Sequence, residues 1–341
     1  MNSARFAALA LCACLVACVS APRVPKADRV FFGRVVTMDP EQPEVEALAI
    51  KDGRIVAIGT ERELRAYVGA DTWVTELDEG ALLPGIIDLR GGLLETAPLD
   101  ESGDPDLAAA QRAAAQDGVT TATVGAADAR QLTLLDAANL AGSLELDVVA
   151  LPRAEEATRL IGRRDFQRYR GRLRLAGIRF DVVGDEQEGW NRLLRHCAVN
   201  DVRIFASCLD AGALDRFLAA LESFPAGVRA DHPIALCDAD PGAPLLERCV
   251  KFDVQVVSRN FDRNTANALT ADAAFQLEES DEKGSLVPGK RADLVVLSTD
   301  PTGLTVAELR EVEVWQTYKD GLLIYELEGR PLRPFRRLRD Q

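Results

Sequence analysis

Residues that could carry out acid–base, nucleophilic or metal-assisted chemistry are few in this sequence. Its 341 residues include only two histidines, His196 and His232. His196 falls near the end of an expected helix and His232 in an expected loop before Pro233, so both positions favour structural roles. A serine hydrolase needs a histidine base beside its nucleophile. A catalytic zinc site needs three protein ligands drawn from imidazole, thiolate and carboxylate. The histidines indicate neither kind of site.

Polar residues at or just after expected buried strands form the remaining candidate set: Ser207, Asp88, Asp181, Asp210 and Asp238. Ser207 with two of these aspartates offers part of a hydrolase triad, but no histidine base is placed for it. The aspartates could instead gather at one edge of a parallel sheet and bind a hard cation. Arg90, Arg153 and Arg179 could equally neutralise them as ion pairs, which is the commoner outcome.

Four cysteines lie in the body of the chain, namely Cys197, Cys208, Cys237 and Cys249. Their spacing contains no C-x-x-C pair and does not predict a zinc site. An oxidising compartment would permit one or two disulfides among them. Buried thiols that pack as small hydrophobic groups are the equally valid alternative, and the sequence leaves both open.

Composition and charge exclude some classes of function. Hydrophobic residues make up 47% of the chain, which predicts a folded protein with a full-sized core in one large or two moderate domains. The net charge of −14 argues against a nucleic-acid-binding protein, because phosphate binding needs a positively charged face. No nucleic-acid partner is therefore expected, and no phosphate-binding glycine loop is present.

The N-terminus has the pattern of a bacterial lipoprotein signal. Arg5 precedes an apolar segment, and Leu15-Val16-Ala17-Cys18 matches the motif in which cleavage precedes a lipidated cysteine. We expect residues 1–17 to be the signal peptide, residues 18–28 a tether, and the lipid on Cys18 to attach the protein to a membrane of the bacterial cell envelope, on the periplasmic or outer-membrane side. An ordinary signal peptide or short anchor is the alternative. Residues 331–341 form a basic tail.

Two similar hairpin patterns lie at opposite ends of the chain. Lys51-Asp52-Gly53 and Lys319-Asp320-Gly321 each separate two apolar runs, and Asp-Gly between such runs predicts a tight β-turn. Neither terminal set of strands makes a comfortable core alone. We therefore expect residues 29–80 and 284–330 to form one β-sandwich domain.

Residues 81–283 alternate apolar runs with amphipathic segments, which is the pattern of an α/β domain. Seven strands are expected, at Leu82–Asp88, Thr120–Val124, Leu146–Leu151, Arg174–Phe180, Arg203–Cys208, Pro233–Asp238 and Val254–Ser258. Helices are expected at Asp106–Gln116, Ala129–Leu140, Glu188–Ala198, Leu214–Ser223, Pro244–Lys251 and Thr265–Leu277.

Three motifs in this framework resemble the amidohydrolase superfamily, in particular amidohydrolase family 3. Leu83-Pro84-Gly85-Ile86-Ile87-Asp88 is similar to the family's first barrel strand, and Gly118-Val119-Thr120-Thr121-Ala122 to the entry of its second. Gly284 to Val295, which reads GSLVPGKRADLV, resembles the family's C-terminal signature. The resemblance implies an α/β fold with a TIM-like (β/α) barrel beside a small β-sandwich domain built from both chain ends. With seven strands and few residues, the barrel is expected to be incomplete.

The resemblance also implies a metal-dependent hydrolase of carbon–nitrogen bonds other than peptide bonds, but the family's ligand positions have changed. The two histidines of the first strand correspond to Arg90 and Gly92, and the carboxylated lysine to Arg179. The later histidines correspond to Ser207 and to Asp238 or, less well, His232, because the spacing to the next strand favours Asp238. We therefore expect no bound metal and no other cofactor, the ancestral divalent ion such as zinc having been lost.

The leading hypothesis from the sequence is an amidohydrolase-like envelope lipoprotein that is catalytically inactive. Arg90, Arg179, Asp210 and Asp238 are the candidates for binding a small ligand, expected to be anionic because of the two arginines. One alternative is an active hydrolase with a site rebuilt from Asp and Ser residues. The other is a non-catalytic scaffold that binds a protein partner in the cell envelope.

Overall fold

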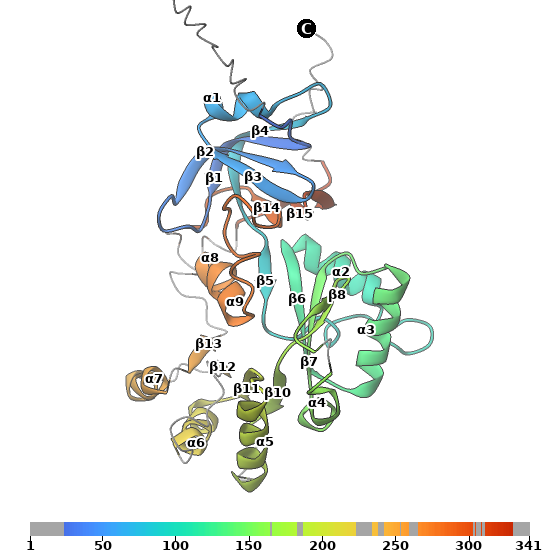
Figure 1. The fold of residues 1–341 in the computed structure, drawn as a ribbon, viewed down its shortest axis with the longest axis vertical. Coiled ribbons are helices and arrows are strands. Elements are labelled where there is room, and N and C mark those ends of the chain that lie inside the picture. Colours follow the sequence, from blue (N-terminus) through green and yellow to red (C-terminus); the bar gives the residue numbers. More distant parts are fainter. Residues whose placement is uncertain are drawn as a thin grey trace, which may run out of the picture.

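The computed structural model describes residues 24–163, 166–182, 187–222, 234–237, 242–252, 254–258, 265–302, 304, 308 and 311–329. Within these residues, strands from both ends of the chain form one sheet at one end of the molecule (Figure 1). The intervening residues form two further sheets flanked by helices, and helices α8 and α9 lie between them and the terminal sheet (Figure 1).

The terminal sheet has seven strands in the order β16-β15-β14-β4-β1-β2-β3. Its strands are β1 (Arg29–Val36), β2 (Glu44–Lys51), β3 (Arg54–Gly59), β4 (Trp73–Pro84), β14 (Leu294–Leu297), β15 (Val314–Lys319) and β16 (Leu322–Glu326). A parallel β1–β4 pair and an antiparallel β4–β14 pair join the two ends of the chain. The predicted small β domain from both chain ends is therefore confirmed.

The two Asp-Gly turns have the backbone that their sequences predict. Asp52 and Gly53 have φ values of 51° and 74°, and Asp320 and Gly321 have values of 49° and 73°. The two turns also meet, because Ala292 donates its N–H to Gly53 O at 2.9 Å and accepts from the N–H of Gly321 at 2.8 Å. The sheet thus curls until its two ends lie together.

A shared core fills the inside of this curled sheet. The rings of Phe31 on β1 and Tyr318 on β15 pack edge to face with centroids 5.3 Å apart, although the two strands are not neighbours in the sheet. The segment after the barrel closes the same core, because the N–H of Leu286 donates to Thr37 O at 2.7 Å. The expected β-sandwich is therefore a single sheet folded over one core.

The Pro84-Gly85 break marks the passage from the terminal sheet to the barrel. The sequence predicted one strand over Leu82–Asp88, but β4 ends at Pro84 and β5 (Ile86–Asp88) belongs to another sheet. Gly85 donates its N–H to Asp293 O at 2.8 Å, and a Cβ at this position would collide with the side chain of Thr120. The break is required by this close packing.

The barrel portion consists of two sheets, ordered β5-β6-β7-β9-β8 and β10-β11-β12-β13. Their strands are β5, β6 (Val119–Ala127), β7 (Asp147–Pro152), β8 (Tyr169–Arg170), β9 (Leu173–Leu175), β10 (Ile178–Asp181), β11 (Ile204–Cys208), β12 (Ile234–Cys237) and β13 (Gln255–Ser258). The predicted strand Arg174–Phe180 is divided at Gly177, whose φ is 68°. Its first part pairs with β7 and its second with β11.

The described strands do not close into a complete ring. The edge of β5 is met by the turn between α8 (Thr265–Ala268) and α9 (Ala271–Gln276), where the N–H of Ile87 donates to Leu269 O at 2.8 Å. This contact interrupts the single helix predicted over Thr265–Leu277. The expected fold class, an incomplete TIM-like barrel with a small β domain, is confirmed.

Helices cover the outer faces of the barrel strands, as Figure 1 shows for α2, α3 and α4 beside β6 and β7. The helices are α2 (Leu107–Gln116), α3 (Ala129–Ala141), α4 (Ala154–Leu160), α5 (Gln187–Val199), α6 (Ala211–Glu222) and α7 (Gly242–Lys251). Asp106 and Asp128 cap α2 and α3 with their side chains, which explains why these starts were predictable. The sequence did not predict α4.

A short helix, α1 (Glu61–Leu64), packs on the terminal sheet. Among the described residues, no helix has the length and apolar character needed to cross a membrane.

Candidate functional site

Two predicted site residues face the inside of the barrel. Phe205 packs in the inner apolar cluster, whereas Ile178 belongs to the larger core beneath the helices. Side chains alternate between the faces of a strand. Arg179 therefore points inward from β10, as does Ser207 from β11, two residues beyond Phe205. Both side chains are buried. Ser207 lies toward the carboxyl end of β11, where barrel enzymes place their active sites, whereas Arg179 is the second residue of β10.

The guanidinium of Arg179 extends from β10 to the loop after β5. Its Nη1 donates to Arg90 O at 2.6 Å, and its Nε has no hydrogen-bond partner in the described part of the chain. Gly91 and Gly125 flank the guanidinium so closely that a Cβ on either residue would collide with it. The side chain of Arg179 thus occupies the space beside the end of the first barrel strand.

The side chain of Arg90 turns elsewhere and pairs with Asp88. Its Nε donates to Asp88 Oδ1 at 2.9 Å and its Nη2 to Asp88 Oδ2 at 2.8 Å. These hydrogen bonds raise the pKa of Arg90, although partial burial opposes the shift. Asp88 and Arg90 line a cavity on the outer, α2 side of the strand together with Gly92. The guanidinium of Arg179 therefore contacts the backbone carbonyl of Arg90 and not its side chain. The two guanidinium groups do not point toward a common ligand.

The other predicted site residues have separate surroundings. Ser207 is the register partner of Asp181, whose side chain is exposed to solvent. Asp210 accepts from the N–H of Ala213 at 2.7 Å and so caps the start of α6, which gives this residue a structural role. Asp238 lies outside the described residues, as do His232 and the lipidation candidate Cys18.

The described donor groups do not fit a catalytic divalent metal. Of the positions that the resemblance assigns to metal ligands, Arg90, Gly92, Arg179 and Ser207 offer no imidazole, thiolate or carboxylate, and the fifth, Asp238, lies outside the described residues. Within the described ranges, no group of three or more His, Cys, Asp and Glu side chains could hold a metal ion. His196 lies on α5, outside the sheet, and its buried Nε2 finds no hydrogen-bond partner in the same part of the chain.

The cysteines are placed as buried groups where their side chains are described. Cys197 on α5 is fully buried and forms no disulfide, and burial raises the pKa of its thiol to about 12. Cys208 and Cys249 are also buried. Cys237 is the backbone register partner of Cys208 across β11 and β12. For Cys197 the alternative of a buried thiol is confirmed.

A buried ionic network at the opposite end of the barrel strands was missed from the sequence. Lys283 Nζ lies 2.6 Å from Asp147 Oδ2 and 2.7 Å from Glu279 Oε2. Lys319 Nζ lies 2.8 Å from the same oxygen of Asp147 and 2.7 Å from Asp293 Oδ2. Asp147 begins β7, so the network lies at the amino ends of the strands, where the terminal sheet meets the barrel. This position indicates a structural role.

The opposite charges in this network stabilise one another, so its carboxylates and ammonium groups stay ionised. Burial alone would raise the pKa of Asp147, but Lys283 and Lys319 outweigh it and hold that pKa well below its usual value. Burial likewise opposes the charge of Lys283, yet Tyr169 and the carboxylates of Asp147 and Glu279 raise the pKa of this ammonium group well above its usual value. One feature of the sequence indicates the network: Asp147 is a charged residue within an otherwise apolar strand segment.

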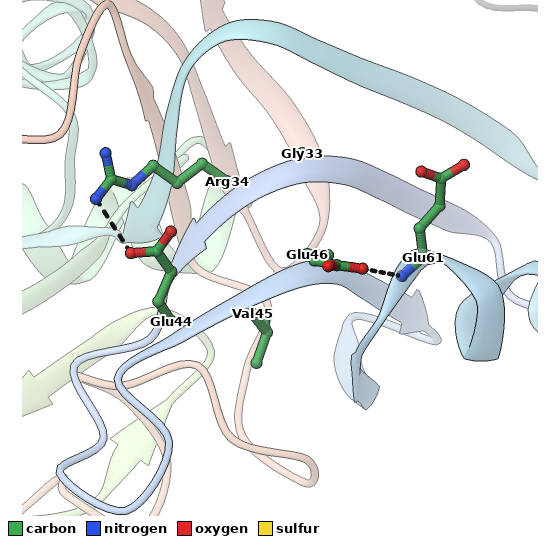
Figure 2. A pocket seen from close by; sticks show the side chains of 6 residues that line it. All are labelled: Gly33, Arg34, Glu44, Val45, Glu46 and Glu61. Carbon is green, nitrogen blue, oxygen red and sulfur yellow. Dashed lines mark hydrogen bonds and ion pairs between the residues drawn. The ribbon is translucent and has the colours of Figure 1, made fainter.

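A second hollow lies on the outside of the terminal sheet (Figure 2). It has a volume of about 780 Å³ and is lined by Gly33, Arg34, Glu44, Val45, Glu46 and Glu61. Its polar groups bond one another, because Arg34 Nη2 donates to Glu44 Oε2 at 3.1 Å and the N–H of Glu61 to Glu46 Oε2 at 3.1 Å (Figure 2). This hollow therefore offers no free reactive group.

Two comparisons of the sequence match a short part of the chain. The model of the amidohydrolase family matches residues 256–325, from β13 to β16. N-substituted formamide deformylase of Arthrobacter pascens is 42% identical over 71 residues, which cover 18% of this chain and 13% of that protein. The chain thus matches only a small part of that relative's length.

Solved structures are similar over most of the chain. An uncharacterized metal-dependent hydrolase of Pyrococcus furiosus is 13% identical, with a TM-score of 0.63 over 80% of this chain and 99% of that one. A mutant of atrazine chlorohydrolase TrzN from Arthrobacter aurescens, complexed with zinc and atraton, is 15% identical, with a TM-score of 0.61 over 90% and 97% of the two chains. At these identities the likeness shows the fold.

Proposed function

We propose that this chain is an amidohydrolase-type protein of the bacterial cell envelope that no longer performs metal-dependent hydrolysis and acts by binding. Two observations support its ancestry, the family match over residues 256–325 and the fold shared with metal-dependent hydrolases. If this ancestry is shared, the reaction that the chain has lost is the hydrolysis of carbon–nitrogen bonds other than peptide bonds.

The placement of Arg179 is the observation that supports the loss of metal chemistry. A guanidinium stays protonated and cannot become the bridging carbamate that a lysine forms. At about 4 Å in an effective dielectric near 20, it would repel a divalent cation by roughly 8 kcal/mol. Gly91 and Gly125 leave room for this guanidinium, so the surrounding backbone accommodates an arginine at the position that the resemblance assigns to a metal ligand.

Attachment to a membrane is the second part of the proposal. The segment Leu15-Val16-Ala17-Cys18 supports lipidation of Cys18, and the acyl chains would hold the folded part close to the membrane surface. Residues 18–28 would then be the tether between the lipid and β1, which begins at Arg29.

The proposal is tested by assaying the purified full chain on N-acyl amino acids, N-substituted formamides and cyclic amides, with added zinc or manganese. We expect no turnover above that of a matched preparation carrying Ser207→Ala. Turnover that disappears in Ser207→Ala but persists in Gly92→Ala would contradict the proposal and establish a rebuilt Asp/Ser hydrolase.

A further inference from the structure

Five cationic side chains are buried in the described part of the chain, and four of them have carboxylate partners. Lys283, Lys319, Arg174 and Arg203 each have a nitrogen atom within 3.0 Å of a carboxylate oxygen. The fifth, Arg179, forms no ion pair with any described residue, although only 7% of its surface is exposed. A buried charge without a partner is costly, so Arg179 requires an anion that the described residues do not supply.

The hydrogen bonds of Arg179 leave one edge of its guanidinium free. Its Nη1 donates to Arg90 O at 2.6 Å, whereas Nε and Nη2, which form the other edge, have no partner among the described residues. Asp181, two residues further along β10, is exposed and forms no ion pair with Arg179. Arg90 shows what such an edge binds in this protein, because its own Nε and Nη2 hold the two carboxylate oxygens of Asp88. The free edge of Arg179 therefore matches a carboxylate in a bidentate pair.

The surroundings of Arg179 are largely apolar and hold its side chain in place. Phe205, its register partner on β11, and Leu89, which follows β5, both belong to the inner apolar cluster. Gly91 and Gly125 hold the guanidinium between them, since a Cβ on either residue would collide with it. The guanidinium is thus fixed before any ligand arrives, and the low polarity around it strengthens its attraction for an anion.

We propose that the free edge of Arg179 binds the carboxylate of a small organic anion, whose short apolar body lies against Phe205 and Leu89. The chain as a whole carries a net charge of −14, so general electrostatic attraction disfavours anions and the affinity has to come from this one site. This inference rests on the proposed function, because it names the class of ligand for a barrel that binds without hydrolysing.

The test is a calorimetric titration of the full chain with sodium butyrate at constant ionic strength, with butyramide as a neutral probe of the same shape. We expect butyrate to bind at one site per chain and butyramide to bind about tenfold more weakly or less, because only the carboxylate forms a charge-assisted bidentate pair. Butyrate that binds no more tightly than butyramide would overturn the proposal, since the guanidinium would then obtain its counter-charge within the chain itself.

Variants of Arg179 assign the binding to this side chain. Arg179→Lys keeps a positive charge but loses the bidentate edge, so it should weaken butyrate binding about tenfold or more, and Arg179→Met should abolish it. Arg130→Gln, which removes an exposed arginine paired with Asp104, is the matched control and should leave binding unchanged. Butyrate binding that survives both changes at Arg179, or that is lost in Arg90→Gln, would overturn the proposal.

The titration of the native chain decides the question even where a variant of Arg179 does not fold, because it compares butyrate with butyramide on unchanged protein. The proposed function fails by a different result, the turnover of an amide substrate, which these titrations do not measure. Weak butyrate binding without turnover would therefore overturn this inference and leave the proposed loss of hydrolysis in place.

Discussion

Lys283 Nζ lies 2.6 Å from Asp147 Oδ2, and this contact joins the barrel to the segment that returns to the terminal sheet. Lys319 of β15 reaches the same carboxylate oxygen at 2.8 Å. All three side chains are almost fully buried, with exposed fractions of 2% or less. The junction between the two parts of the molecule is thus built on one shared carboxylate held by two ammonium groups.

Removing the negative charge of Asp147 should strongly destabilise the fold. Asp147→Asn would leave two buried ammonium groups undercompensated, and breaking a buried pair in this way costs about 3–5 kcal/mol. The free energy of unfolding, measured by urea denaturation, provides the check. The matched control is Glu61→Gln, which removes an exposed ion pair with Arg65 and should change stability by less than about 1 kcal/mol. Equal effects of the two variants would show that the network contributes little.

Stability should fall in acid because the carboxylates of the network have lowered pKa values. Burial opposes ionisation of Asp147 and Glu279, but their cationic partners outweigh it. Their contribution is therefore complete above the unfolded pKa of about 4 and is lost as the pH falls below it toward the folded values. Each group should add up to about 1.4 kcal/mol per pH unit to the slope. Urea unfolding from about pH 7 to about pH 3 should show a shallower decline in Asp147→Asn than in the native chain.

Gly125→Ala should destabilise the protein because its Cβ would collide with the guanidinium of Arg179. Overpacking of this kind costs about 1–3 kcal/mol. Gly92→Ala is the matched control, because a Cβ there would meet only Thr96, at 3.9 Å. Combining Gly125→Ala with Arg179→Ala should relieve the collision, so the double variant should be less destabilised than the two single effects combined. Purely additive effects in thermal or urea unfolding would contradict the described packing.

Lipidation of Cys18 predicts that the native protein fractionates with membranes and with detergent. Cys18→Ser should release the mature protein or leave an unprocessed precursor. Cell fractionation and intact mass measurement check this, because each acyl chain adds a defined mass. Native protein found entirely in the soluble fraction with an unmodified Cys18 would show that the segment is an ordinary signal peptide.

Local signals in the sequence were sufficient for much of the fold. The Asp-Gly turns and the capping residue Asp106 each act through backbone chemistry that one short segment contains. Boundaries set by distant contacts were not predictable. The strand predicted over Arg174–Phe180 divides because its two parts pair with different neighbours, and α8 and α9 separate because Leu269 accepts a hydrogen bond from the edge of β5.

The geometry of the candidate site could not be predicted from the sequence. The motif resemblance predicted that Arg90 and Arg179 stand at former metal positions. It did not predict that the Arg90 side chain turns toward Asp88 on the outer face of β5.

The central claim is that the barrel has lost its metal chemistry, and the metal content of the purified full chain tests it most directly. The measurement is elemental analysis for zinc, manganese, nickel and iron after mild dialysis, repeated after incubation with each ion. We predict a content far below one ion per chain in every case. A content close to one ion per chain that is lost in Asp238→Ala or Ser207→Ala, together with turnover of an amide substrate, would contradict the account.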